Sequence, residues 1–186
     1  MTIAVPWGPL GAYLAVVMLQ RVGELMLSAR NLTRLRSRGA IEAGARHFPL
    51  FVVLHAGYLV ALVFEVLAGA RPPAAWPAWL ALWLAAQVLR VMAIATLGER
   101  WNVRIVVLPG EPPVSRGIYR WLPHPNYVAV ALEFVAAPLM FGACWTALGG
   151  TLLNAVAMAV RIPAEDRALR AAARAGAPGN EKPGAE

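Results

Sequence analysis

A short aromatic segment at residues 117–127 carries residue types well suited to binding a ligand. It reads Gly117-Ile118-Tyr119-Arg120-Trp121-Leu122-Pro123-His124-Pro125-Asn126-Tyr127 and lies between two long apolar runs. Aromatic rings attract cations, so the segment predicts a binding loop. The simpler interpretation is a helix start at Pro125, because proline fits the first helical position, with His124 as its cap. In that case Trp121 and Tyr127 would be interfacial aromatic residues.

A second group of charged residues stands where the last apolar run stops. Arg161 and Glu165 are four residues apart, about one helical turn, and Pro163 lies between them. The proline predicts a break or kink, after which a new helix begins. Glu165 and Asp166 are then either acids favoured in the first turn of that helix, or part of a corner that directs Arg161 and Glu165 into one cavity.

Four more charged residues lie inside the apolar runs, namely Arg21, Glu24, Arg90 and Glu133. At a rise of 1.5 Å per residue, each lies roughly 7–12 Å from the same end of the bundle. Ionisable groups inside a membrane usually face a partner or a polar cavity. Snorkelling and an ion pair between Arg21 and Glu24 would explain those two alone. Together with Arg161, the set predicts a polar cavity open to one side of the membrane.

The elements that position these residues are membrane helices. The chain has 186 residues, of which 59% are hydrophobic, and its mean hydropathy is +0.57. Apolar runs of spanning length recur, at residues 7–29, 47–69, 79–97, 126–142 and 145–162. The last two are so close together that they predict a tight antiparallel hairpin. We therefore expect an all-α polytopic membrane protein with about five transmembrane helices.

The chain is expected to form a single domain over residues 1–175. A three-helix part, 1–98, precedes the part that carries both motifs, 99–175. Residues 164–174 predict a basic surface helix, and the Pro/Gly-rich residues 176–186 a disordered tail. Residues 1–6 lack a basic stretch, so no cleaved signal peptide is expected. Glu65 lies near the other end of its run and is expected to be a surface residue.

The net charge of +7 arises from sixteen Arg and one Lys against ten acids. Thirteen of the cations lie in the segments 30–46 and 99–123 and in the tail from residue 163, whereas the opposite side has only Arg71. The positive-inside rule then places the N-terminus outside and the C-terminus in the cytosol. It explains the charge without nucleic acid as a partner. The single Cys144 excludes an intramolecular disulfide and a multi-cysteine metal site, and no metal is expected.

The Gly-x-Tyr, the His-Pro-x-Tyr and the distal Arg-x-x-x-Glu-Asp, in this order, resemble the C-terminal signature of the isoprenylcysteine carboxyl methyltransferase family. The resemblance covers about residues 99–170 and implies an integral membrane enzyme that uses S-adenosylmethionine. The run at residues 100–110 looks like small bacterial members, which implies a bacterial inner membrane. Two positions depart from the family pattern. Pro123 stands where Arg is usual, and Asp166 stands where a second Glu is usual.

The resemblance also implies roles for individual residues. The residues matching the cofactor-binding positions are Val114, Tyr119, His124, Pro125, Asn126, Tyr127 and Glu165. Arg161 would face the methyl-accepting group, so Arg161 and Glu165 are the candidate catalytic residues. Arg90 and Glu133 join Arg161 as candidate substrate-binding residues because of their depth in the bundle.

The expected function is O-methylation, with S-adenosylmethionine, of a lipophilic acceptor reached through the lipid bilayer. The acceptor is a prenylated, isoprenylcysteine-type carboxylate or an alkyl-polyketide phenol, and a phospholipid amine stays open. A carboxylate arrives ionised, whereas a phenol with a pKa near 10 needs a base, for which Glu165 and His124 are candidates. The alternative is a non-catalytic transporter or lipid-binding protein, but transporters are often built from internal repeats, and the sequence has no evident repeat.

Overall fold

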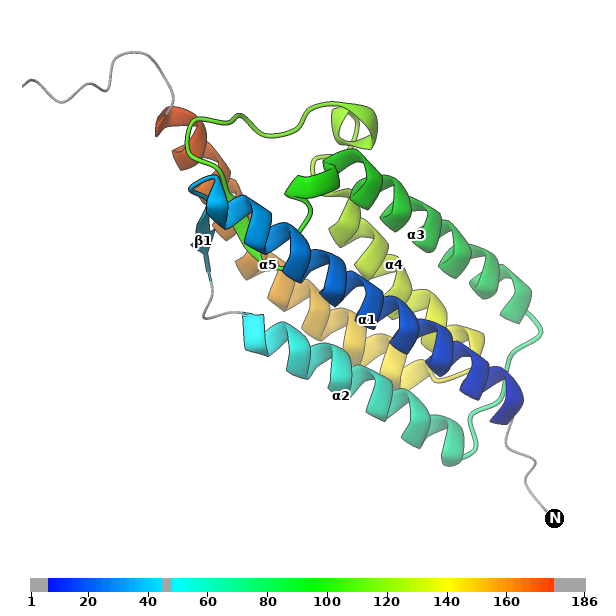
Figure 1. Ribbon diagram of the computed structural model, residues 1–186. Coiled ribbons are helices and arrows are strands. Elements are labelled where there is room, and N and C mark those ends of the chain that lie inside the picture. Colours follow the sequence, from blue (N-terminus) through cyan, green and yellow to red (C-terminus); the bar gives the residue numbers. More distant parts are fainter. Residues whose placement is uncertain (1–6, 45–47, 176–186) are drawn as a thin grey trace, which may run out of the picture.

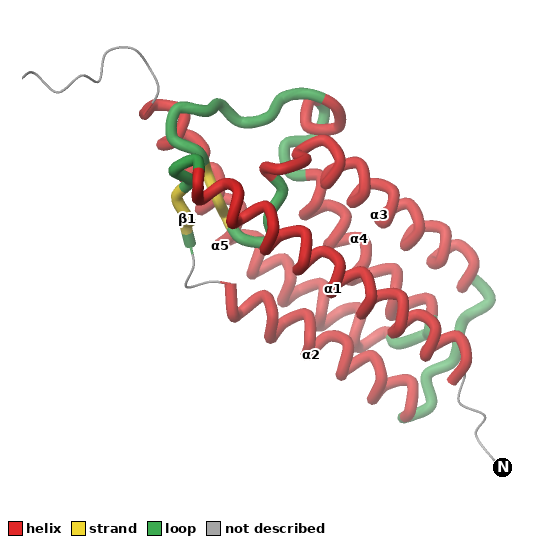
Figure 2. The backbone as a smooth tube through the Cα atoms, viewed as in Figure 1, coloured by secondary structure: helices red, strands yellow, loops and turns green. Residues whose placement is uncertain are grey.

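The computed structural model describes residues 7–44 and 48–175, which form a bundle of five helices (Figure 1). The helices are α1 (Trp7–Ser37), α2 (Phe48–Leu67), α3 (Trp76–Leu97), α4 (Pro125–Met140) and α5 (Cys144–Ala175). Four are long and apolar enough to cross a membrane, and α4 is a shorter apolar helix. The tube view in Figure 2 is dominated by helix. The expected all-α membrane fold is therefore confirmed, including the tight α4–α5 hairpin.

One end of the bundle carries the long connections, and we call it the loop end. Here α1 and α3 end, α2 and α4 begin, and the last turns of α5 project (Figure 1). The α3–α4 connection crosses this end and contains the 3₁₀ turns η2 (Gly98–Arg100) and η3 (Gly117–Arg120). Its strand β2 (Ile105–Val107) pairs antiparallel with β1 (Ile41–Ala43) from the α1–α2 connection. The sequence does not predict these strands, since three residues show no usable alternation.

The opposite end of the bundle is closed by apolar packing. Tyr13 of α1 makes edge contacts with Trp83 of α3 at 5.7 Å and with Phe141 at 5.5 Å between ring centroids. Leu10 and Leu62 are fully buried in the same cluster. This packing holds α1, α2, α3 and the α4–α5 hairpin together at the end opposite the loops.

The prediction of a helix break at Pro163 is wrong. The structure has one continuous helix, α5, from Cys144 to Ala175. Proline removes one backbone hydrogen bond, but helices tolerate it where packed neighbours and the apolar surroundings leave no better arrangement for the backbone. Glu165 and Asp166 therefore lie inside a helix, and their interpretation as acids of a first helical turn fails with the break.

Glu65 is also more than a surface residue. Its carboxylate, from α2, accepts hydrogen bonds from the backbone N–H groups of Trp145 at 3.0 Å and Thr146 at 2.7 Å. The first N–H groups of a helix have no partner within the helix. Glu65 supplies that partner from a neighbouring helix and joins α2 to the start of α5, a contact that local sequence patterns do not contain.

Candidate functional site

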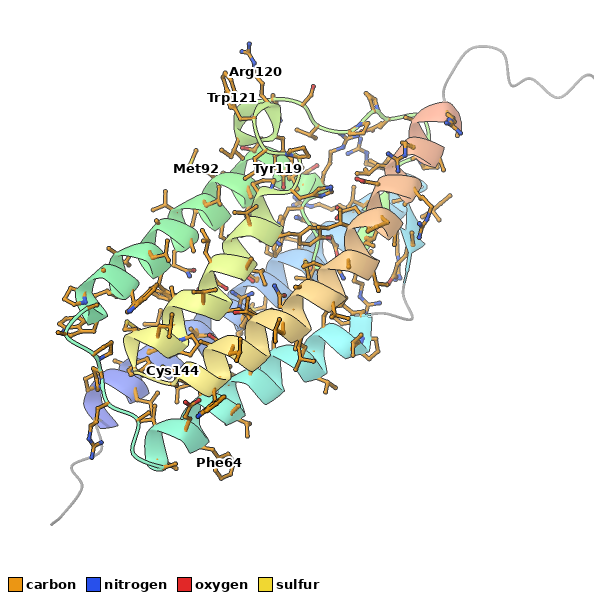
Figure 3. The ribbon with its side chains drawn as sticks, turned by 180° about the vertical axis from the view of Figure 1, so that it is seen from behind. Phe64, Met92, Tyr119, Arg120, Trp121 and Cys144 are labelled. Atoms are coloured by element: carbon orange, nitrogen blue, oxygen red, sulfur yellow. The ribbon has the colours of Figure 1, made fainter. Side chains whose placement is uncertain are left out.

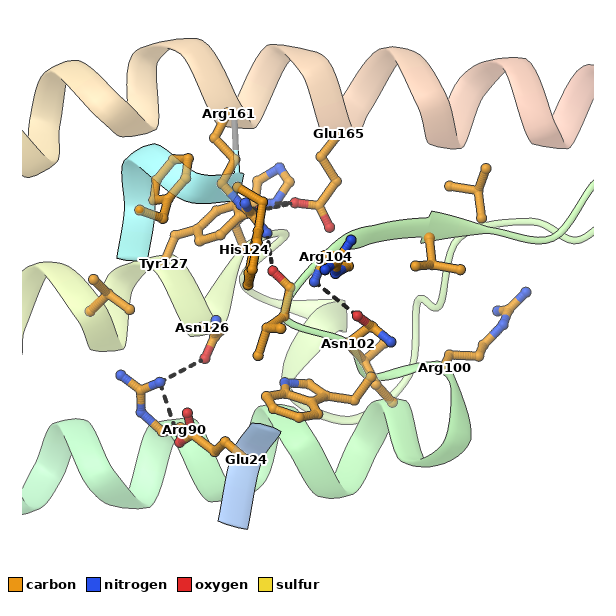
Figure 4. A pocket seen from close by; sticks show the side chains of 18 of the residues that line it. Glu24, Arg90, Arg100, Asn102, Arg104, His124, Asn126, Tyr127, Arg161 and Glu165 are labelled. Carbon is orange, nitrogen blue, oxygen red and sulfur yellow. Dashed lines mark hydrogen bonds and ion pairs between the residues drawn. The ribbon is translucent and has the colours of Figure 1, made fainter. Parts of the chain in front are cut away.

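A cavity of about 450 Å³ lies toward the loop end of the bundle (Figure 4). Its walls come from all five helices and from the α3–α4 connection, including β2. The shared origin of the walls means that no single segment forms the site.

The wall formed by α4 and α5 contains a chain of three polar side chains. Arg161 is only 8% exposed, and its Nε donates a hydrogen bond of 2.8 Å to the hydroxyl of Tyr127. The Tyr127 hydroxyl in turn donates to Oε2 of Glu165. A second nitrogen of Arg161, Nη2, donates to the carbonyl of Val103 at 2.6 Å, and the guanidinium lies 4.7 Å above the ring of Phe51. Arg161 and Glu165 thus face the same cavity, as one of the two sequence interpretations predicts.

His124 lies between the acids of α5 and the ring of Tyr127. Its Nε2 is 3.1 Å from Oδ1 of Asp166, and its Nδ1 is 3.8 Å from Oε2 of Glu165. Its ring stacks on Tyr127 with centroids 5.4 Å apart. Pro125 is the first residue of α4, as predicted, but the His124 side chain makes no capping bond within the described chain. His124 is nevertheless the N-cap residue of α4, as the sequence predicts, and its ring is directed to Asp166.

The Gly-x-Tyr element packs against the end of α3. Gly117 has φ +56°, and a Cβ there would lie 2.8 Å from Oγ1 of Thr96. Only glycine takes both this backbone conformation and this approach without strain. The resulting turn, η3, brings Tyr119 to the cavity. Burial, and to a smaller extent the Glu165 carboxylate, raises the pKa of Tyr119 well above its usual range, so its hydroxyl remains a donor.

Two arginines and two carboxylates form an ion network at the deep side of the cavity, and three of them, Arg21, Glu24 and Arg90, line it. Arg90 is 2% exposed, and its Nε and Nη2 donate to Glu133 at 3.1 and 2.5 Å. Its Nη1 lies 3.5 Å from Glu24 and from Oδ1 of Asn126. Arg21 completes the set, at 2.8 Å from Glu24 and 3.5 Å from Glu133. The four charges balance, and the pairs join α1, α3 and α4.

Helix α1 is also attached to the α3–α4 connection. The buried amide of Asn31 donates to the carbonyls of Gly98 at 3.1 Å and Trp101 at 2.8 Å. Ser28 donates to Asn102 at 2.9 Å. These contacts hold the α3–α4 connection over the cavity. Neither Asn31 nor Ser28 is a candidate from sequence, since only the fold brings residues about 70 positions apart together.

With this geometry in place, known proteins give a consistent picture. The model of the isoprenylcysteine carboxyl methyltransferase (ICMT) family matches residues 79–171. The chain is also 38% identical over 160 residues to the uncharacterized protein YpbQ of Bacillus subtilis (strain 168), covering 84% of this chain and 94% of that one. The chain belongs to the ICMT family. An uncharacterized protein of Haemophilus influenzae is 28% identical over 158 residues, or 83% of this chain and 91% of that one. No solved structure matches.

ICMT-family membership makes this chain an integral membrane protein of a methyltransferase family. The family match begins at residue 79 and therefore includes α3 with Arg90, in addition to the segment that carries the sequence motifs. Helices α1 and α2 lie before the match, yet they form two of the walls of the cavity.

Most of the predicted site residues line the cavity, and they are Val114, Tyr119, His124, Asn126, Tyr127, Arg161, Glu165 and Arg90. Two do not. Pro125 is buried at the start of α4, and Glu133 lines a smaller cavity of about 40 Å³ behind the network. The five intramembrane charges fall into two groups. Four of them form the ion network, and Arg161 belongs to the opposite wall. Pro123, at the position where the family usually has Arg, lines the cavity as well.

Other cavity residues are not among the sequence candidates, and they include Phe51, His55, Trp101, Asn102 and Arg104. Phe51 resembles an ordinary residue of an apolar run, whereas His55 is an ionisable residue inside a predicted span, which is a signal that could have identified it. The other three belong to a polar connection whose path over the bundle depends on β1–β2 pairing and on the contacts with α1. Their place in the site follows from long-range contacts.

Proposed function

We propose that this chain is an S-adenosylmethionine-dependent O-methyltransferase of the membrane. It acts on a carboxylate or hydroxyl of a lipophilic acceptor, either of the isoprenylcysteine type or an alkyl-polyketide phenol. The observation that carries the proposal is a single cavity with a charged, aromatic wall on one side and an apolar opening on another. Such a site can take a polar cofactor and a long-chain acceptor together.

The residues present fit the cofactor. The volume of about 450 Å³ lies in the range of roughly 300–1,000 Å³ typical of small-molecule sites. The Glu165 carboxylate suits a cationic group, and the rings of Tyr119, His124 and Tyr127 suit an adenine face or a sulfonium. When bound, S-adenosylmethionine supplies a methyl group on a cationic sulfur. Asn126 and the backbone near Val114 would complete the binding residues.

The side of the cavity between α1 and α2 suits entry of an apolar tail. Met18 and Leu25 of α1 and Val52 of α2 line the cavity and are 52%, 52% and 53% exposed, respectively. In a membrane helix, exposed apolar side chains at this depth face lipid. An amphiphile could therefore enter with its tail still in the bilayer, and each buried methylene would contribute about 0.8 kcal/mol.

Arg161 is placed to orient the acceptor oxygen. Its Nε and Nη2 are held by Tyr127 and Val103, and Nη1 has no hydrogen-bond partner among residues 7–44 and 48–175. The fixed guanidinium can direct Nη1 to a carboxylate or phenolate. Methyl transfer depends mainly on such positioning and on charge complementarity. The Tyr127 hydroxyl couples Arg161 to Glu165, so the acceptor and cofactor residues are held as one unit.

Two measurements test the proposed function. Calorimetry with S-adenosylmethionine in detergent should detect binding, and transfer of a labelled methyl group should rise with the length of the acceptor's apolar tail. Arg161→Ala should lower turnover far more than cofactor affinity, and Arg161→Lys should be intermediate because lysine keeps the charge but not the fork of donors.

Three other outcomes would contradict the proposal or part of it. No cofactor binding would favour a transporter or lipid-binding protein. Equal rates on short, water-soluble acceptors would contradict entry from the membrane. A strong preference for amines would remove Arg161 from the role of binding an anionic oxygen.

A further inference from the structure

One ionisable side chain in the cavity has no role in the function proposed so far. His55, in α2, lines both the large cavity and the smaller one behind it. Its Nδ1 lies 2.8 Å from the backbone carbonyl of Phe51. A carbonyl only accepts hydrogen bonds, so Nδ1 carries the proton of the neutral ring, and Nε2 carries the free lone pair.

Nε2 of His55 is available to a ligand. No hydrogen bond joins it to any described residue. In that part of the chain, the buried side-chain polar atoms without a partner are Oγ1 of Thr151 and Oδ1 of Asn154, and Nε2 is not among them. Nε2 therefore has exposed surface, and His55 lines two cavities. An edge contact with Phe134, at 5.2 Å and 90°, holds the ring in place.

His55 also lies close to the residue proposed to orient the acceptor. Phe51, whose ring lies 4.7 Å from the Arg161 guanidinium, precedes His55 by one turn of α2. One turn is about 5.4 Å. By contrast, both ring nitrogens of His124 are directed at carboxylates, and Glu165 already accepts the Tyr127 hydroxyl. Of the three candidate bases, His55 is the one that makes no hydrogen bond or ion pair to another described side chain.

We propose that His55 is a general base, which selects an acceptor with a neutral hydroxyl group. This inference rests on the proposed function. The hydroxyl proton passes to Nε2 while its electron pair stays on the oxygen. That oxygen forms the new bond to the methyl carbon of the sulfonium donor, and the sulfur keeps the pair of the broken C–S bond as a thioether. A carboxylate acceptor has no proton to give, and its negative oxygen would be repelled by the lone pair of Nε2.

The surroundings of His55 allow the proton to leave afterwards. The smaller cavity, of about 40 Å³, is larger than the 10–15 Å³ that one water needs. Charged and titratable groups from three helices share this cavity with His55, namely Tyr13 and Arg21 of α1, Tyr58 of α2 and Glu133 of α4. Arg90 of α3 lies behind them, paired with Glu133.

The test compares two phenols with the same long alkyl chain, one unsubstituted and one nitrophenol that is largely ionised at the assay pH. His55→Gln should lower turnover of the unsubstituted phenol by about 10²–10⁴-fold, the usual effect of a general base. The loss for the nitrophenol should be at least tenfold smaller, because its proton is already gone. The control His124→Gln should lower both rates by the same factor, since it acts through the cofactor site.

A second readout needs no cofactor and no turnover. At a pH where the nitrophenol is half ionised, its absorption when bound to the wild-type protein should show more phenolate than when bound to His55→Gln or His55→Asn. Cofactor affinity by calorimetry verifies that each variant is folded. Equal losses for the two phenols, or identical spectra in wild type and variants, would overturn the role of His55. Absence of methyl transfer by the wild-type protein to every acceptor would instead contradict the proposed function.

Discussion

At the scale of single residues, the site is held by hydrogen bonds that leave specific atoms free. Tyr127 connects Arg161 with Glu165, so each of these residues limits the motion of the others. Asp166, which stands where the family usually has a second Glu, contacts the imidazole of His124. The shorter acid therefore has a structural role. The polar groups left unbound in this wall, such as Nη1 of Arg161, are the ones available to ligands.

Removing the charge of Glu165 should weaken cofactor binding. Glu165→Gln keeps an oxygen that accepts from Tyr127 but loses the negative charge, so the affinity should fall by about 1–3 kcal/mol, the value of a hydrogen bond to a charged group. Calorimetry measures the change. The matched control is Glu99→Gln, because Glu99 pairs with Arg34 on the surface and does not line the cavity. Equal affinities of Glu165→Gln and wild type would leave Glu165 with a structural role only.

At the scale of elements, the buried ion network determines how α1 meets α3 and α4. Its charges balance, and its members lie on three different helices. The rest of α1 packs against apolar residues at the closed end and against the α3–α4 connection at the loop end. The network therefore sets the depth at which the cavity stops.

Removing one member of an ion pair in this network should lower the free energy of unfolding more than neutralising both members of the pair. Arg90→Met leaves Glu133 and Glu24 buried with fewer partners, and a loss of about 3–5 kcal/mol in the free energy of unfolding is expected. Adding Glu133→Gln removes one of the unpaired charges, so the double variant should be more stable than Arg90→Met alone. Thermal unfolding in detergent measures both. A double variant less stable than the single one would contradict a role for charge balance.

The α4–α5 turn provides a second test at this scale. Gly142 has φ +75°, and a Cβ there would lie 1.9 Å from the carbonyl oxygen of Arg71, a backbone atom that cannot move aside easily. Gly142→Ala should lower the free energy of unfolding by about 1–2 kcal/mol for the left-handed residue, and further because of the clash. The loss should appear as a lower unfolding temperature.

The matched control for this turn is Gly149→Ala. Gly149 lies within α5, and a Cβ added there would have nothing within 4 Å. Alanine also favours helix over glycine by up to about 1 kcal/mol. This variant should therefore be neutral or slightly stabilised. Similar losses for both glycine variants would show that the α2–α3 connection does not pack on the turn as described.

At the scale of the whole molecule, the two ends of the bundle differ in character. Figure 3 shows Arg120 and Trp121 at the loop end and Cys144 at the other. Trp121 is 78% exposed, and its ring lies 5.3 Å from the Arg120 guanidinium. Near Cys144, Trp145 is 79% exposed. Exposed tryptophans next to a spanning bundle mark interfaces with headgroups, so one interface is expected near each end.

The loop end should face the cytosol, with the N-terminus outside. Cys144 is the single cysteine of the chain and is exposed, so a membrane-impermeant thiol reagent added outside should label the wild-type protein. A cysteine at the exposed Ser115, in a Cys144→Ser background, should be labelled only after the membrane is permeabilised. The reverse pattern would invert the orientation and place the cavity on the outer side.

The sequence by itself determined the membrane fold, the approximate spans and the grouping of charges at one end of the bundle. Hydropathy and the fixed rise of a helix are local properties, so Arg21, Glu24, Arg90 and Glu133 could be placed at one depth without a structure. The motif residues Tyr127, Arg161 and Glu165 could be assigned to one site because their family resemblance joins segments distant in the chain. The predicted disordered tail and the residues at the very N-terminus lie outside the described residues.

Only the tertiary structure decided which partner each of these groups takes. The local cost of Pro163 predicts a helix break, but the packing of α5 against its neighbours outweighs one lost hydrogen bond. Glu65 became a cap for α5, and His55 became a cavity residue, because one face of α2 packs against α5 and α4. Such outcomes depend on contacts between residues far apart in the sequence, and the energy of those contacts is not present in any local pattern.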